Sequence, residues 1–228
     1  MVKVCGLIEA ANALACAEAG ADWIGLNFHP ASPRSIPVRL GAEIARALQL
    51  QGRAEPVALF VNRPVAEVIA TVRDLGAVST IQLHGDESPE DLIRLQELAP
   101  TLRIIRAFRL SDSASIDRML AYLDRADQLG CPPHAILVDA HVPGQMGGTG
   151  HAIAFDLLAH LPSHHRMILA GGLTPENVAD RVALVRPWMV DVASGVESSP
   201  GRKDREKVIE FIAAVRGLKT DRKDGNGS

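Results

Sequence analysis

The chain has 228 residues, of which 47% are hydrophobic and 22% charged, and its net charge is −3. This composition is ordinary for a globular protein and excludes a disordered or collagen-like chain. Aromatic residues make up only 4% and the charge is slightly negative, so neither nucleic acid nor a membrane surface is an expected partner. The length fits one or two domains, and a single barrel or sandwich also reaches this size.

The cysteines, Cys5, Cys16 and Cys131, are odd in number and lack the spacing of a zinc site. This pattern argues against a disulfide framework and a structural metal. The first residues lack the apolar segment of a signal peptide, and no apolar run approaches the roughly 18 residues of a membrane span. We therefore expect a soluble, cytoplasmic protein that binds no metal.

Short apolar runs rich in β-branched residues recur along the chain as candidate strands. Most lack strict alternation of polar and apolar residues, as buried parallel strands do. Their starts are about 27 residues apart, which leaves room for one strand and one helix each. The runs are Val2–Cys5, Asp22–Phe28, Pro56–Val61, Thr80–His84, Arg103–Phe108, Ala135–Ala140, Arg166–Ala170 and Met189–Ser194.

Helical patterns lie between these candidate strands. The segments Leu40–Leu48, Val65–Val72 and Val208–Val215 each repeat apolar residues at helical spacing, which predicts one buried face per helix. Ser88 and Thr174 are each followed by proline, so each is a predicted N-cap with proline at the first helical position.

Eight successive βα units predict a single (β/α)8 TIM barrel over residues 1–216, with a doubly wound open sheet as the alternative. No break in composition marks a second domain. Residues 217–228 are polar and show no periodicity, which predicts a disordered tail.

In such a barrel, functional residues lie where strands end and the following loops begin. Cys5 ends the first strand, where it is either a small buried hydrophobe or a thiolate acting as base or nucleophile with a lowered pKa. Asp139 ends the sixth strand after three apolar residues, as either an acid or base at the mouth or a salt-bridged barrel residue. Cys16 lies in the first predicted helix and is expected to pack, and Cys131 has no visible role.

Two strand ends that carry glycine are candidate phosphate loops. Gly171 and Gly172 follow the seventh strand, and Ser194 and Gly195 close the eighth. Barrels often hold a phosphate between these two loops through free backbone N–H groups, and a short helix expected near Val196–Ser199 adds its dipole. Plain tight turns are the alternative.

The remaining candidates come from other loops at the same end of the barrel. Arg34 follows the second strand, and its planar fork suits a carboxylate, although a solvated surface charge is the alternative. His84 ends the fourth strand and either orients substrate or caps a loop. Residues 141–150 form a glycine-rich stretch between Asp139 and the weakest helix pattern, Phe155–His160, which predicts a lid.

Eight short motifs stand in order along the chain, each at a predicted strand end or in the loop that follows. They are Lys3–Gly6, Asn27–Arg34, Phe60–Asn62, Gln82–Asp86, Val138–Asp139, Gly147–Gly150, Leu169–Leu173 and Asp191–Glu197. Together they resemble the phosphoribosylanthranilate isomerase family of tryptophan biosynthesis. The resemblance extends from Val2 to about Arg216.

The resemblance implies a cofactor-free barrel that converts N-(5'-phosphoribosyl)anthranilate to 1-(2-carboxyphenylamino)-1-deoxyribulose 5-phosphate by an Amadori rearrangement. It implies that Cys5 is the general base, Asp139 the general acid and Arg34 the ligand of the anthranilate carboxylate. The positions that match the family's phosphate cradle are Gly171, Gly172, Ser194 and Gly195. The expected partner is therefore a phosphorylated small molecule, bound by a monomer or a homodimer.

Two residues depart from the family pattern, because His151 stands where lysine is common and His29 where an aromatic ring is frequent. Two other functions remain open. A related aminoaldose–ketose isomerase of histidine biosynthesis typically has aspartate at the position of Cys5. A non-enzymatic phosphosugar-binding barrel would keep the glycines but would not need Cys5 opposite Asp139.

Overall fold

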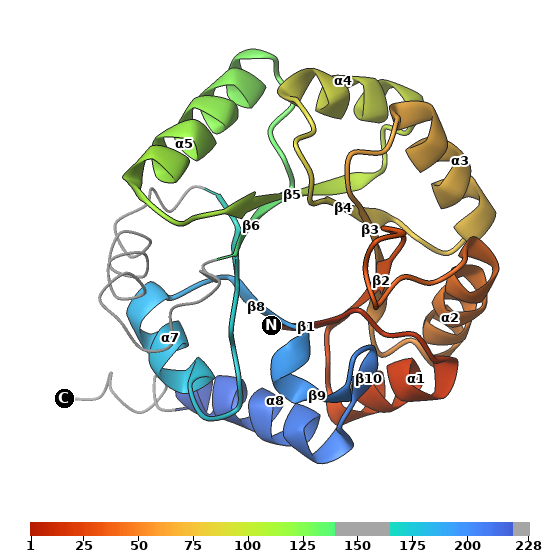
Figure 1. Ribbon diagram of the computed structural model, residues 1–228, viewed down its shortest axis with the longest axis vertical. Coiled ribbons are helices and arrows are strands. Elements are labelled where there is room, and N and C mark those ends of the chain that lie inside the picture. The colour runs from red at the N-terminus through yellow and green to blue at the C-terminus, as the bar shows by residue number, and fades with distance from the viewer. Residues whose placement is uncertain (140–164, 221–228) are drawn as a thin grey trace.

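The computed structural model describes residues 1–139 and 165–220. Parallel strands close into a barrel in sequence order, and the last strand pairs with the first (Figure 1). This closure confirms the predicted (β/α)8 barrel and excludes the open sheet. The strands are β1 (Val2–Cys5), β2 (Trp23–Asn27), β3 (Glu55–Phe60), β4 (Thr80–Leu83), β5 (Arg103–Arg109), β6 (Ala135–Asp139), β7 (Met167–Ala170) and β8 (Met189–Val192).

The described helices form an outer ring around the barrel (Figure 1). None of them is both long and apolar enough to cross a membrane. They are α1 (Ala10–Ala19), α2 (Val38–Gln51), α3 (Val65–Leu75), α4 (Pro89–Leu98), α5 (Ser113–Gln128), α7 (Val178–Val185) and α8 (Arg205–Thr220).

Three sequence predictions concern residues near or beyond the ends of the described ranges. Helix α8 continues to Thr220, so the domain boundary expected after residue 216 falls inside a helix. Residues 221–228 of the predicted tail lie outside the described residues. The predicted helix Phe155–His160 also lies outside them.

Each strand is buried on both faces, which explains why the apolar runs do not alternate. The larger apolar core packs the outward face of the strands against the helices. A second, separate cluster fills the barrel interior with side chains such as Trp23, Val57, Ile105, Leu137 and Met189. These residues fill the interior toward the amino-terminal ends of the strands, and a cavity opens toward the carboxyl ends.

The two predicted N-caps behave differently. Ser88 caps α4 in a capping box, in which its Oγ accepts a hydrogen bond from Asp91 N and its own N donates to Asp91 Oδ2. The prediction for Thr174 is wrong, because α7 begins only at Val178 and Asn177 is its N-cap. Asn177 Oδ1 accepts a hydrogen bond from Thr174 N at 2.9 Å, so the side chain stabilises a turn before the helix.

The short helix expected near Val196–Ser199 does not form. The chain makes one 3-10 turn, η1 (Ser194–Val196), and then an antiparallel hairpin of β9 (Glu197–Ser199) and β10 (Arg202–Lys203). Gly201 stands in the connecting turn with φ +85°, a conformation that side chains other than glycine rarely adopt. The hairpin directs Glu197 and Lys203 toward each other.

Candidate active site

A cavity of about 420 Å³ opens where the barrel strands end. All eight residues predicted from the sequence to form the site line this one cavity, although they come from six different strand ends. They are Cys5, Arg34, His84, Asp139, Gly171, Gly172, Ser194 and Gly195. The structure therefore brings these eight predicted residues together.

Alternation along the strands explains why these side chains reach the interior. Lys3 and Cys5 lie two residues apart on β1, and both face the inside of the barrel. Asp139 and Arg109 are the last residues of β6 and β5, are paired in the strand register and both line the cavity. Arg109 was missed from the sequence because the predicted fifth strand ended one residue too early, at Phe108.

Cys5 lies at the floor of the cavity and is 7% exposed. Gly25 on β2 gives its Sγ room, because a Cβ at Gly25 would lie only 2.5 Å from that sulfur. Burial raises the pKa of the Cys5 thiol above its ordinary value, although the nearby ammonium of Lys3 opposes the rise. The expectation of a lowered pKa is therefore wrong, since desolvation of the thiolate outweighs the positive charge beside it.

His84 follows β4 and lies against the buried side chain of Gln82. Gln82 Nε2 and His84 Nδ1 are 2.8 Å apart. Burial lowers the pKa of His84 to about 4, assisted by the positive charges of Arg109, Lys3 and Arg106. The imidazole is thus neutral near pH 7, and a neutral ring can both donate and accept a hydrogen bond in the cavity.

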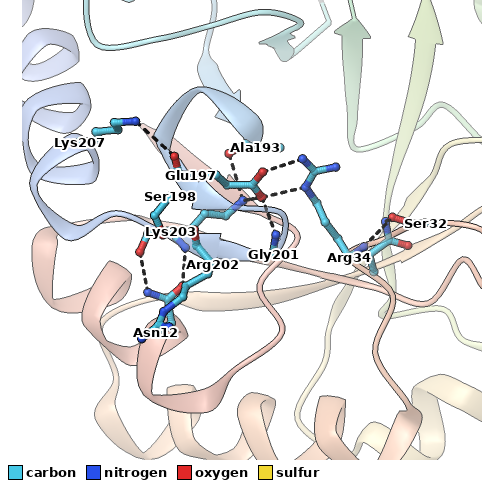
Figure 2. Close-up of polar contacts among 11 residues, drawn as sticks. Asn12, Ser32, Arg34, Ala193, Glu197, Ser198, Gly201, Arg202, Lys203 and Lys207 are labelled. Atoms are coloured by element: carbon cyan, nitrogen blue, oxygen red, sulfur yellow. Dashed lines mark hydrogen bonds and ion pairs between the residues drawn. The ribbon is translucent and has the colours of Figure 1, made fainter.

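Arg34 reaches the cavity from the loop after β2. Gly6 makes this possible, because a Cβ at Gly6 would lie 2.5 Å from Arg34 Cδ, and Gly6 also adopts φ +77°. The guanidinium forms a two-fold ion pair with Glu197, which the sequence analysis did not predict as a partner (Figure 2). Arg34 is therefore not a solvated surface charge. Part of its guanidinium is already occupied by Glu197, and the rest can bind an anion.

The two glycine loops lie against each other at the ends of β7 and β8. Gly171 and Gly172 have φ values of +97° and +62°, which turn the chain sharply after β7. A Cβ at Gly195 would lie 1.8 Å from the carbonyl oxygen of Leu173, so only glycine allows this close approach of the two loops. Ser194 is exposed at the start of η1. Small residues here leave backbone N–H groups accessible to an anion.

Of the other residues singled out from the sequence, some are described by the structure and others are not. His29 lines the cavity, and its backbone N donates a hydrogen bond to Asn27 Oδ1 at 2.8 Å. Cys16 and Cys131 are free and buried, which agrees with the packing role expected for Cys16. The predicted lid, residues 141–150, and His151 lie outside the described residues.

No group of His, Cys, Asp and Glu side chains within residues 1–139 and 165–220 is arranged to hold a metal ion. The described cavity instead combines a thiol, a carboxylate, a neutral imidazole and an arginine with two glycine loops. This set can exchange protons with a substrate while it binds two separate anionic groups.

Comparison with known proteins shows one family that matches nearly the whole chain. Residues 2–214 match the family model described as N-(5'phosphoribosyl)anthranilate (PRA) isomerase. A curated protein of Geobacter metallireducens, named N-(5'-phosphoribosyl)anthranilate isomerase, is 41% identical over 215 residues, which cover 94% of this chain and 98% of that protein.

Solved structures agree with the sequence relatives. The crystal structure of phosphoribosyl anthranilate isomerase from Thermotoga maritima superposes with a TM-score of 0.81 and 32% identity, covering 95% of this chain and 98% of that one. A phosphoribosyl anthranilate isomerase in complex with reduced 1-(o-carboxyphenylamino)-1-deoxyribulose 5-phosphate gives a TM-score of 0.79 and 30% identity, with the same coverage.

Proposed function

The chain belongs to the N-(5'-phosphoribosyl)anthranilate isomerase family, and we propose that its cavity converts N-(5'-phosphoribosyl)anthranilate to 1-(2-carboxyphenylamino)-1-deoxyribulose 5-phosphate. Membership confirms the family that the sequence motifs indicated. The observation that carries the proposal is the meeting of Cys5, Asp139, Arg34 and the two glycine loops around one cavity.

The first chemical step opens the ribose ring. Asp139 donates a proton to the furanose oxygen while the bond between that oxygen and C1 breaks. The lone pair of the anilino nitrogen forms the new C=N bond, so the intermediate is a Schiff-base cation. Asp139 is suited to this step because it ends β6 and lines the cavity at its mouth.

The second step moves a proton away from the sugar. The thiolate of Cys5 takes the proton from C2, and the electron pair of that C–H bond neutralises the cation to give an enolamine. The enolamine then gains a proton at C1 and loses its hydroxyl proton at O2, which yields the ketone. The cationic intermediate acidifies C2 and favours a nearby thiolate, so a buried thiol with a raised pKa can still serve.

Binding uses the two ends of the substrate. The loops carrying Gly171, Gly172 and Gly195 support a phosphate through backbone N–H groups, and Arg34 supports the anthranilate carboxylate through its guanidinium. His84 contributes a neutral ring to the same cavity. The Schiff base uses the nitrogen of the substrate itself, so the mechanism requires no cofactor.

The described cavity is lined by residues of one chain, so a monomer or a homodimer can carry this activity. We place the enzyme in the cytoplasm, where biosynthesis of an amino acid requires it. Size-exclusion chromatography with light scattering distinguishes the two oligomeric states.

The test is a parallel assay of the purified chain with two substrates. One is N-(5'-phosphoribosyl)anthranilate, and the other is the aminoaldose bisphosphate used by the related isomerase of histidine biosynthesis. Turnover of the first substrate alone supports the proposal. Turnover of only the second would favour the histidine enzyme, and binding without turnover would favour a phosphosugar-binding barrel.

A further inference from the structure

Glu197 forms an ion pair with Arg34, which reaches the cavity from the loop after β2 (Figure 2). Arg34 Nε donates to Glu197 Oε1 at 2.8 Å, and Arg34 Nη2 donates to Oε2 at 2.6 Å. Arg34 is 24% exposed and lines the cavity, whereas the side chain of Glu197 is 6% exposed and does not line it. One edge of the guanidinium is thus occupied by the protein itself.

The carboxylate of Glu197 is fixed by two further donors. Lys203 Nζ donates to Oε1 at 2.7 Å, and the backbone N of Gly201 donates to the same oxygen at 3.0 Å. The β10 strand that carries Lys203 is anchored to α1, because Asn12 exchanges two hydrogen bonds with the backbone of Lys203 (Figure 2). Glu197 therefore has little freedom to leave Arg34.

The network also contacts the loop assigned to phosphate binding. Lys203 Nζ donates a second hydrogen bond to the carbonyl oxygen of Ala193 at 3.0 Å (Figure 2). Ala193 directly precedes Ser194 and Gly195, which line the cavity. One buried ammonium group thus links the ion pair of Arg34 and Glu197 to the loop that carries Ser194 and Gly195.

The charges leave Arg34 able to bind one more anion. Arg34 and Lys203 supply two positive charges, and Glu197 supplies one negative charge, so the cluster keeps one net positive charge. Among the described residues, no acceptor is hydrogen-bonded to Arg34 Nη1. The edge formed by Nη1 and Nη2 can therefore receive a carboxylate with two parallel hydrogen bonds.

We propose that Glu197 is a positioning residue that holds Arg34 so that its Nη1–Nη2 edge receives the carboxylate of the substrate. This inference rests on the proposed function, in which Arg34 binds anthranilate. Glu197 stays in place when substrate binds, because its departure would leave the fully buried ammonium of Lys203 without its carboxylate partner.

The test compares the affinities of two ligands for the full chain. One is the product, 1-(2-carboxyphenylamino)-1-deoxyribulose 5-phosphate, and the other is the phenylamino analogue that lacks the carboxylate. The preference is the ratio of their dissociation constants, measured for wild type, Glu197→Gln, Arg34→Ala and the double variant. Glu67→Gln is the matched control, because Glu67 on α3 forms an exposed ion pair with Arg63, which precedes that helix.

We expect Glu197→Gln to reduce the preference for the carboxylate about tenfold, the worth of one charge-assisted hydrogen bond. The affinity for the analogue should stay near that of wild type. Because Glu197 acts through Arg34, the substitution should change nothing further once Arg34 is alanine. Glu67→Gln should leave both affinities unaltered.

Three results would overturn the inference. An unchanged preference would mean that Arg34 needs no support, and an increased one would mean that Glu197 competes with the substrate. Equal weakening of both ligands would mean a purely structural role. If Glu197→Gln does not fold, Glu197→Asp replaces it, because it keeps a charge for Lys203 but is too short to hold Arg34 as well. A wild type that shows no preference for the carboxylate would instead contradict the proposed function.

Discussion

Lys3 Nζ lies 3.0 Å from Asp191 Oδ1 inside the barrel, across the seam where β1 pairs with β8. The two residues are direct partners in the strand register, and their side chains are 0% and 9% exposed. Burial alone would lower the pKa of Lys3, but the carboxylate of Asp191 and the thiol of Cys5 raise it above its ordinary value. The ion pair therefore joins the two strands that close the barrel and keeps a positive charge near Cys5.

Breaking this pair should destabilise the barrel. In Lys3→Met the carboxylate of Asp191 is left buried without a partner, which costs about 3–5 kcal/mol. Replacing both residues, as in Lys3→Met with Asp191→Leu, removes both charges and should recover much of that loss. Urea unfolding measures both variants. If Lys3→Met were as stable as wild type, water or another group would already stabilise the buried carboxylate of Asp191.

The thiol of Cys5 should react slowly with iodoacetamide at neutral pH. Its raised pKa places the midpoint of the alkylation rate above about 8.5, the ordinary value for a cysteine. Loss of the ammonium in Lys3→Met should move the midpoint higher still, and substrate should protect the thiol. Mass spectrometry of modified Cys5 against pH gives the midpoint. A value below 8.5 would mean that positive charge outweighs burial at this site.

His84 should make the stability of the protein depend on pH. Its pKa is about 4 when folded and near 6.5 when unfolded, so the unfolded chain binds more protons between these values. The contribution is fully present above about pH 6.5 and is lost as pH falls through 4, by about 3 kcal/mol in total. His84→Gln should flatten this part of the curve of unfolding free energy. If the unfolding free energies of wild type and His84→Gln changed with pH in parallel, the lowered pKa of His84 would be contradicted.

Gly195 should not tolerate a side chain. In Gly195→Ala the new Cβ would meet the carbonyl oxygen of Leu173 at 1.8 Å, so the loop proposed to bind phosphate must shift. Loss of one N–H bond to the anion corresponds to about tenfold weaker binding of inorganic phosphate, measured by calorimetry.

Gly217→Ala is the matched control for Gly195→Ala, because a Cβ at Gly217 in α8 meets nothing within 4 Å. It should leave phosphate binding unchanged and stabilise the helix by roughly 0.5–1 kcal/mol. Equal affinities of Gly195→Ala and Gly217→Ala for phosphate would mean that Gly195 is not part of the proposed phosphate site.

The sequence is sufficient to predict the barrel and the location of the site, because both follow from local patterns. Strand runs and their spacing depend on neighbouring residues, and the barrel rule then brings the strand ends together. Cys5 and Asp139 could be found for this reason alone.

The interactions that tune these residues could not be predicted, since they join distant parts of the chain. Lys3 and Asp191 are 188 residues apart, and Arg34 and Glu197 are 163 apart. The direction of the Cys5 pKa shift depends on how deeply the cavity buries the thiol, which no local pattern contains. The error at Val196–Ser199 has the same origin, because the hairpin there is held by Lys203 and Asn12.

The turnover number of the purified enzyme with N-(5'-phosphoribosyl)anthranilate, compared with those of Asp139→Asn and Cys5→Ala, tests the central claim most directly. Asp139→Asn keeps the shape of the side chain but has no proton to transfer, and Cys5→Ala has no base. General acid–base catalysis is worth about 100- to 10,000-fold, so kcat should fall at least about 100-fold in each folded variant. A folded variant of either kind with kcat near that of wild type would contradict the account.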